Sequence, residues 1–274
     1  MNAETDNEDK TENNAKNKAE VHIGIRNLTM AFGSFVLQRD LDFNVYHGDV
    51  FVIMGGSGCG KSTLLKHMLG LISPAKGDIL YDGISFTHAS EEQQNQMRQR
   101  WGITYQSGGL FSAMTTGQNV ALPLQLYTGY NESEIKDIVA YKLSLVGLAG
   151  YQDFYPSEIS GGMRKRAALA RAIALDPEIL FFDEPSAGLD PISSRLLDEL
   201  IVQMQESLGA TVIMVTHELP SIFDIATNSV YLDAQSRTMI GYGNPSDLRE
   251  NTDQAVVRQF LNRGIAATGE TENE

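Results

Sequence analysis

One glycine-rich segment has the pattern that proteins use to hold phosphate groups. Residues 55–63 read GGSGCGKST and fit G-x-x-x-x-G-K-[ST]. Glycines allow successive N–H groups to surround phosphate oxygens, and a helix beginning after the loop adds its positive end. A glycine turn that binds nothing is the alternative, but the Lys-Ser pair between an apolar strand and a helix favours phosphate binding. The predicted nucleotide contacts are Gly55, Gly56, Ser57, Gly58, Cys59, Gly60, Lys61, Ser62 and Thr63, with the Ser62 hydroxyl also available to Mg²⁺.

Two acidic residues follow a second apolar stretch. Residues 179–182 read ILFF and lead directly into Asp183 and Glu184. A buried strand delivers its carboxyl end to the crevice beside a phosphate loop. We therefore expect Asp183 to hold Mg²⁺ through water and Glu184 to polarise an attacking water molecule. An ordinary acidic helix start before Pro185 is the alternative, and the phosphate loop makes it the weaker one.

A third segment could form a second phosphate nest. Residues 159–163 read ISGGM and open a predicted helix. Serine and two glycines at a helix start present free N–H groups to an anion. A nucleotide held between two copies of the chain would use one nest from each copy. Taken alone, Ser160 would be read as a simple helix cap.

The elements that position these residues alternate between strands and helices. This order predicts an α/β fold, with a mainly parallel sheet covered on both faces. Residues 1–19 and 265–274 are polar and aperiodic, which predicts disordered tails around one domain over 20–264. Strands are predicted at 21–29, 36–45, 49–54, 79–81, 103–106, 178–183, 210–216, 230–233 and 239–242, and helices at 61–69, 91–100, 117–157 (with 132–146 the clearest), 162–175 and 191–208.

Composition excludes several classes of protein. The 274 residues include 35 acidic and 21 basic side chains, giving a net charge of −14. Such a balance argues against broad nucleic-acid binding, which needs a cationic face. The apolar runs are far shorter than the ~20 residues of a membrane-spanning helix, and the acidic N-terminus does not resemble a secretory signal. The single cysteine, Cys59, cannot form an internal disulfide, which fits a reducing compartment.

Together these motifs resemble the ATPase of ABC systems, with ATP and Mg²⁺ as cofactors. The resemblance implies a P-loop NTPase fold of ABC type with an N-terminal antiparallel β subdomain and a helical subdomain over about 107–175. It assigns Gln106 to γ-phosphate sensing and Mg²⁺ binding, and His217 to the γ-phosphate. Residues 186–190, ending at Asp190, resemble the loop that crosses to the partner chain. The remaining implied contacts are Phe32 for adenine stacking and Ser160, Gly161 and Gly162 for the nucleotide of the opposing copy.

Finer resemblance favours the ATPases of the Mla/Mce phospholipid-transport systems. It rests on residues 106–111, on 156–175 with methionine at 163, and on 256–261. The implied protein is cytoplasmic, peripheral on the inner face of the bacterial inner membrane. Implied partners are a second copy of the chain, a permease in two copies, a small STAS-domain protein and a lipid-binding MCE-type ring protein, without nucleic acid. A cell-division ATPase, an iron–sulfur assembly ATPase and another importer or exporter remain alternatives.

Several other residues carry weaker expectations. Leu110, Phe111 and Met114 are expected to be exposed for permease contact, and the amphipathic segment 253–261 is expected to contact a partner. The cluster Arg164, Lys165 and Arg166 indicates a solvated helix face. Four of the five histidines, His22, His47, His67 and His88, show no metal-ligand spacing.

Overall fold

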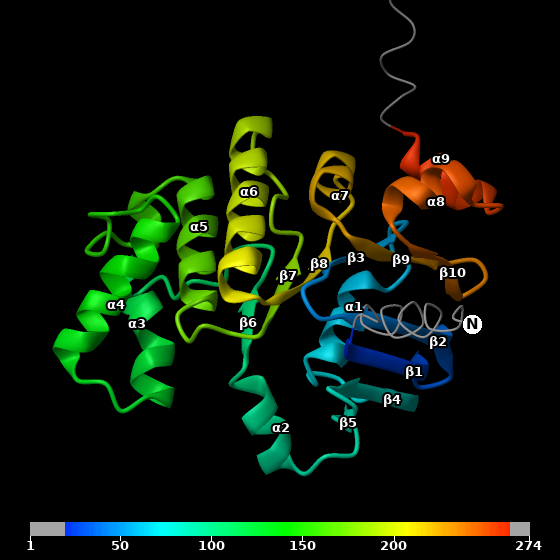
Figure 1. The fold of residues 1–274 in the computed structure, drawn as a ribbon, viewed down its shortest axis with the longest axis horizontal. Helices are drawn as coiled ribbons and strands as arrows, with labels where there is room; N and C mark the ends of the chain where they lie inside the picture. Colours follow the sequence, from blue (N-terminus) through cyan, green and yellow to red (C-terminus); the bar gives the residue numbers. More distant parts are fainter. Residues whose placement is uncertain (1–19, 264–274) are drawn as a thin grey trace, which may run out of the picture.

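The structure is a computed structural model that describes residues 20–263 (Figure 1). The predicted disordered tails, 1–19 and 265–274, lie outside the described residues. Strands form two sheets, one of four strands in the order β2-β1-β4-β5 and one of six in the order β10-β9-β3-β8-β7-β6. The strand bounds are β1 Val21–Phe32, β2 Phe35–Tyr46, β3 Val50–Gly55, β4 Lys76–Tyr81, β5 Ile84–Ser85, β6 Trp101–Thr104, β7 Ile179–Asp183, β8 Thr211–Val215, β9 Asn228–Asp233 and β10 Thr238–Gly243.

The four-stranded sheet is antiparallel, and the six-stranded sheet is parallel except for its edge strand β10. The α/β class, the mainly parallel core and the N-terminal antiparallel sheet are thus confirmed. Helices connect most strands of the parallel sheet and also follow its edge strand β10. They are α1 Lys61–Met68, α2 Glu91–Arg98, α3 Thr116–Tyr127, α4 Glu132–Leu145, α5 Gly161–Ala172, α6 Pro191–Leu208, α7 Leu219–Ile225, α8 Pro245–Asn251 and α9 Ala255–Leu261, with a short 3-10 helix at Pro156–Glu158.

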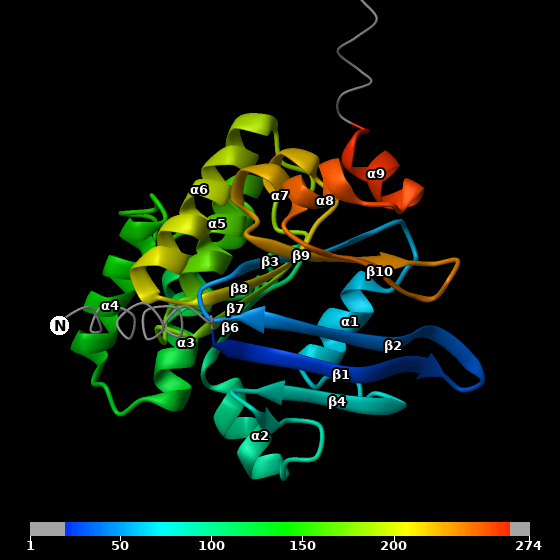
Figure 2. The same ribbon diagram turned by 45° about the vertical axis from the view of Figure 1, so that its right-hand side comes forward.

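The central strands are apolar on both faces because both faces are covered. On β3, Val52 and Met54 join one buried cluster with residues of α3 to α6, whereas Phe51 and Ile53 join another with α1 and the antiparallel sheet. Figure 2 shows the resulting layers, with α5 and α6 on one side of the parallel sheet and α1, β1 and β2 on the other. All six residues of β3 are buried, which is typical of a parallel strand in a layered α/β fold.

The helical region predicted over 117–157 is confirmed for its clearest segment, 132–146, which is α4 with Asn131 as its cap and Gly147 after its end, and is wrong over 147–155. The chain forms two helices, α3 and α4, joined at residues 128–131, and then runs without α-helix to Pro156. Asn131 begins α4 by accepting hydrogen bonds from the N–H groups of Ser133 and Glu134. Positive φ angles of 68° at Gly147 and 85° at Gly150 prevent the helix from continuing. The helix predicted over 162–175 is α5, which ends three residues earlier than predicted, at Ala172.

Three short elements were not predicted, namely β5, α7 and α8. Helix α9 lies within the predicted amphipathic segment, but it packs on its own domain. Val257, Phe260 and Leu261 are buried in the core, whereas Val256 is exposed. Among the described residues, no helix combines the length and the apolarity needed to cross a membrane.

A buried carboxyl group joins α6 to α7. The Asp198 Oδ2 atom accepts a hydrogen bond from the Ser221 hydroxyl at 2.6 Å, whereas Oδ1 has no partner among the described residues. The pKa of Asp198 is raised from 3.8 to about 6, mainly by burial. The charges of Asp224 and Glu218 also raise this pKa, whereas the hydrogen bond from Ser221 lowers it. The native state therefore holds this proton more tightly than the unfolded state does.

We expect Asp198→Asn to stabilise the protein at pH 8 and not at pH 4. Because the native pKa is raised, the charged carboxylate costs stability progressively as the pH rises from about 4 to about 6. The full cost is on the order of 3 kcal/mol, and the amide will recover on the order of 1–2 kcal/mol because its own N–H groups need partners. Urea unfolding at both pH values measures this, with Asp137→Asn on the exposed face of α4 as the control. An equal effect at both pH values would contradict the explanation.

Candidate functional site

The segment predicted to bind phosphate lies between a strand and a helix, β3 and α1, as expected from the sequence. Gly55 has φ 146°, and a Cβ atom there would lie 2.4 Å from the Leu232 carbonyl oxygen and 2.6 Å from the Cys59 sulfur. Gly58 and Gly60 also have positive φ angles. No side chain caps the start of α1, so its first N–H groups are free of such a bond. The loop is therefore shaped to present backbone donors to an anion.

Two side chains stabilise this loop in different ways. The Lys61 ammonium donates to the carbonyl oxygens of Gly55 and Gly56, at 3.0 and 3.1 Å, and thus closes over the loop. The Cys59 side chain is fully buried in the core, and burial raises the pKa of its thiol. Cys59 can therefore contribute only backbone atoms to a nucleotide.

The two predicted magnesium ligands that lie farthest apart in sequence are neighbours in space. The Ser62 hydroxyl donates to the Asp183 carboxylate at 2.9 Å. Ser62 is the second residue of α1, and Asp183 is the last residue of β7. The parallel sheet therefore brings both residues to its carboxyl edge. A hydroxyl and a carboxylate are hard oxygen ligands of the kind that Mg²⁺ prefers. The pair fits a magnesium ion bound together with nucleotide phosphates.

Glu184 is held in an unusual conformation beside His217. Its φ of 51° is positive, and its N–H donates to the Val215 carbonyl at 2.9 Å. The side chain is only 13% exposed, and its Oε1 atom lies 2.9 Å from Nδ1 of His217. The second carboxylate oxygen is buried without a partner among the described residues. An unpaired carboxylate oxygen at this edge can accept a proton or orient a water molecule.

The segment predicted to form a second phosphate nest lies at the start of α5. The Ser160 hydroxyl caps α5 by accepting from the Met163 N–H at 3.2 Å. Helices α5 and α1 pack on opposite faces of the parallel sheet. Asp190 caps α6, accepting from the N–H groups of Ile192 and Ser193, and the Ser193 hydroxyl helps to lower the pKa of its carboxyl. The nucleotide roles of Ser160 and Asp190 remain predictions.

Gln106 and Phe32 are both exposed near the ends of strands. Gln106 follows β6 after one intervening residue rather than lying within a strand over 103–106. Phe32 is 51% exposed at the end of β1, where it pairs with Phe35 across a turn at Gly33. Both positions leave the side chain free for a ligand, and their assigned roles remain predictions.

Sequence reasoning missed Gln38, which holds the backbone of the phosphate loop by a hydrogen bond. Its Nε2 atom donates to the carbonyl oxygens of Cys59, at 2.8 Å, and Asp233, at 2.9 Å. Gln38 is fully buried on β2. Gln38 is out of phase with the buried Leu41, Phe43 and Val45, because the pairing of β1 with β2 is irregular there, so the alternation in the sequence does not reveal it.

The basic cluster on α5 is not a solvated helix face. Arg164 donates to the Ile159 carbonyl at 2.9 Å, and Arg166 donates to the Val146 carbonyl at 3.0 Å. Lys165 donates to the Ala187 carbonyl, and burial lowers the pKa of its ammonium while nearby Glu184 raises it. The cluster thus ties α5 to the loops around it, including the one that follows Glu184.

Comparisons with known proteins identify the family. The family model described as ABC transporter matches residues 38–187. The chain is 42% identical to the intermembrane phospholipid transport system ATP-binding protein MlaF of Haemophilus influenzae, over 87% of this chain and 89% of that protein. It is 41% identical to the probable ribonucleotide transport ATP-binding protein mkl of Mycobacterium leprae, over 93% of this chain and 73% of that protein.

Solved structures agree with these relatives. CbiO1 from Clostridium perfringens, part of the ABC transporter complex cbiONQ, superposes with a TM-score of 0.77 at 28% identity, covering 91% of this chain and 98% of that one. The bacterial ABC transporter cassette MJ0796, solved as a dimer, gives 0.74 at 27% identity, covering 81% and 98%. With the phosphate loop, the acidic strand end and the fold in agreement, the chain belongs to the ABC transporter family and is an ATPase.

Proposed function

We propose that this chain is the ATP-binding and hydrolysing subunit of a bacterial ABC transporter that moves phospholipids between the inner and outer membranes. The observation that carries the proposal is the similarity to MlaF of Haemophilus influenzae over most of both chains. MlaF of Escherichia coli K12, at 38% identity over 89% of each chain, supports the same reading. The mycobacterial relative's name suggests ribonucleotide transport instead, which makes that cargo the alternative to be tested.

In the proposed mechanism, the phosphate loop and Lys61 bind the β- and γ-phosphates of ATP. Ser62 and Asp183, with Gln106 beside the strand end, would hold Mg²⁺, which supplies positive charge at the phosphates. Glu184 orients water and accepts its proton, and His217 fixes the Glu184 carboxylate and reaches the γ-phosphate. Most of the rate acceleration then comes from positioning and charge stabilisation.

One copy of the chain supplies only half of the proposed site. Because α5 packs on the sheet face opposite α1, we propose that Ser160 and Gly162 of a second copy cover the nucleotide. ATP then holds a homodimer together, and hydrolysis releases it. The dimer structure of MJ0796 supports this arrangement.

The proposed assembly places the dimer on the cytoplasmic face of the inner membrane. Its partners are two copies of a permease subunit, a small STAS-domain protein and a lipid-binding MCE-type ring protein. Mild-detergent purification from native membranes, followed by mass spectrometry of proteins and lipids, tests this. Permease, ring protein and phospholipid are the expected result. A septal membrane protein, soluble scaffold proteins, or a ribonucleotide carrier in place of the lipid-binding protein would each overturn the phospholipid assignment.

Phe111 is the strongest candidate for contact with the permease. It is 53% exposed, whereas Leu110 and Met114 are half-buried, so exposure was predicted correctly for only one of the three. Buried Asn119 holds the Phe111 backbone from both sides, with its Oδ1 accepting from the Phe111 N–H at 2.8 Å and its Nδ2 donating to the carbonyl at 3.1 Å. The backbone is fixed while the ring stays exposed.

We expect Phe111→Asp to reduce permease co-purification by about tenfold or more, because a charge would have to be buried in the interface. ATP turnover by the isolated chain should stay unchanged. Pull-down with tagged permease measures the loss, and Tyr141→Asp on the exposed part of α4 is the matched control. Equal recovery of the permease with both variants would exclude Phe111 from the interface.

A further inference from the structure

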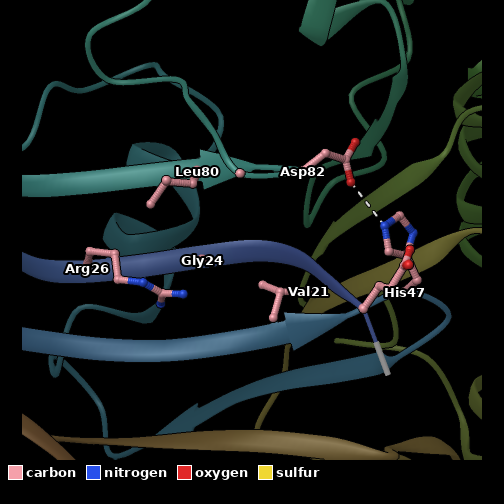
Figure 3. Close-up of a pocket in the computed structure, with 8 residues that line it drawn as sticks. Val21, Gly24, Arg26, His47, Leu80 and Asp82 are labelled. Atoms are coloured by element: carbon pink, nitrogen blue, oxygen red, sulfur yellow. Dashed lines mark hydrogen bonds and ion pairs between the residues drawn. The ribbon is translucent and has the colours of Figure 1, made fainter. Parts of the chain in front are cut away.

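Two histidines and an aspartate meet where the antiparallel sheet joins the parallel sheet. His22 lies on β1, His47 directly follows β2, and Asp82 directly follows β4. The Asp82 Oδ1 atom lies 3.0 Å from Nε2 of His47 and 3.9 Å from Nε2 of His22. One ligand atom from each residue lies within 4.8 Å of the others, and Figure 3 shows His47 facing Asp82. His22 and His47, which show no metal-ligand spacing in the sequence, are thus brought together by the fold.

We propose that His22, His47 and Asp82 form a binding site for a divalent transition-metal ion, and that the preferred ion is Zn²⁺. Two imidazoles and one carboxylate are a common protein ligand set for zinc, with water in the fourth position. Mg²⁺ and Ca²⁺ prefer oxygen ligands, so this site differs in chemistry from the proposed magnesium site at Ser62 and Asp183.

The surroundings of the three residues resemble the outer shell of a metal site. His22 is buried, and its Nδ1 atom lies 2.7 Å from the Thr211 hydroxyl, which can accept the Nδ1 proton and leave the Nε2 lone pair free. Arg100 donates to Oδ2 of Asp82 at 3.1 Å and leaves Oδ1 for the ion.

Charge and access also favour a cation here. Arg100 lies between the carboxylates of Asp82 and Glu178, so two negative groups face one positive group beside the imidazoles. His47 and Asp82 line a surface cavity of about 400 Å³, which gives an ion and its water a way in. Glu20 and Arg26, which carry opposite charges, line the same cavity.

Ion binding requires one side-chain movement. The rings of His22 and His47 are stacked, with centroids 3.8 Å apart and planes inclined by 11°. Nitrogen lone pairs lie in the ring plane, so two stacked rings cannot both point at one ion. The His47 side chain is 45% exposed and can turn, whereas His22 is held by Thr211. We therefore expect His22 to keep its position when the ion binds and the His47 ring to turn toward the ion.

The site's position predicts an effect on stability rather than on phosphate chemistry. Thr211 begins β8 and Glu178 precedes β7, so the cluster lies at the amino ends of the parallel strands. The phosphate loop leaves from their carboxyl ends. A bound ion would join β1, β2 and the turn after β4, and thereby fasten the antiparallel sheet together.

Zinc titration of the untagged, metal-stripped, full-length protein without nucleotide tests the proposal. One Zn²⁺ ion per chain and a rise in the unfolding temperature are expected. His47→Ala should weaken zinc binding by at least about 100-fold, more than the loss of an outer-shell partner. Asp82→Asn should have a similar effect, and the exposed position of His47 makes its variant the safer one for folding.

Two control variants separate this site from other sources of zinc binding. His88→Ala removes an exposed histidine outside the cluster and should leave the affinity unchanged. Asp183→Asn removes the proposed magnesium ligand and should also leave zinc binding unchanged. Binding of zinc with equal affinity by His47→Ala and the unaltered protein, or the absence of stoichiometric binding, would overturn the proposal.

Discussion

Replacing Glu184 with glutamine is expected to lower ATP turnover by about 100-fold or more, because a general base contributes this much in typical enzymes. The amide cannot accept the proton of the attacking water. The glutamine side chain has the same shape and can keep the contact with His217. The substitution removes the basic Oε2 atom, which is buried and has no partner among the described residues. ATP binding should survive, so ATP-bound dimers should accumulate. Steady-state turnover and size-exclusion chromatography with ATP measure the two effects.

Glu206→Gln supplies the matched control for this substitution. Glu206 is exposed on α6, so the same chemical change there should leave turnover within about twofold of the unaltered protein. Near-normal turnover by Glu184→Gln would remove Glu184 from the role of base. The contact with His217 would then have to be interpreted as a structural feature of the strand end.

The parts of the site that depend on local sequence could be predicted. The order of strand, glycine loop and helix around Lys61 follows from residues adjacent in the chain. The Ser62–Asp183 contact could also be anticipated, because parallel strands bring their carboxyl ends to one edge. The positive φ angle of Glu184 could not, since it depends on the hydrogen bond to Val215 in a neighbouring strand.

Contacts between distant segments account for what sequence reasoning missed. Gln38 reaches the phosphate loop only because β2 folds beneath it, and the two histidines of the proposed zinc site meet only through pairing of β1 with β2. Likewise, Arg166 appeared solvated because its acceptor, the Val146 carbonyl, belongs to another element. The helix error over 147–155 has a different cause, since apolar residues there pack into the core without helical backbone.

Lys61→Ala is expected to weaken ATP binding by about 100-fold, because hydrogen bonds to a charged group contribute about 1.5–3 kcal/mol. The ammonium already donates to the carbonyls of Gly55 and Gly56, so it is poised within reach of phosphates bound in the loop. Truncation removes both the charge at the phosphates and this closure of the loop. Equilibrium binding of a fluorescent ATP analogue measures the loss.

Lys66→Ala separates the two contributions of Lys61 from a general loss of positive charge. Lys66 lies exposed on the same helix, so its removal changes the net charge equally without touching the loop. Lys61→Arg keeps the charge but carries a larger planar group, so it should bind ATP less tightly than the unaltered protein and more tightly than Lys61→Ala. Unchanged binding by Lys61→Ala would contradict the phosphate-loop assignment, because a phosphate-binding loop requires the Lys61 ammonium.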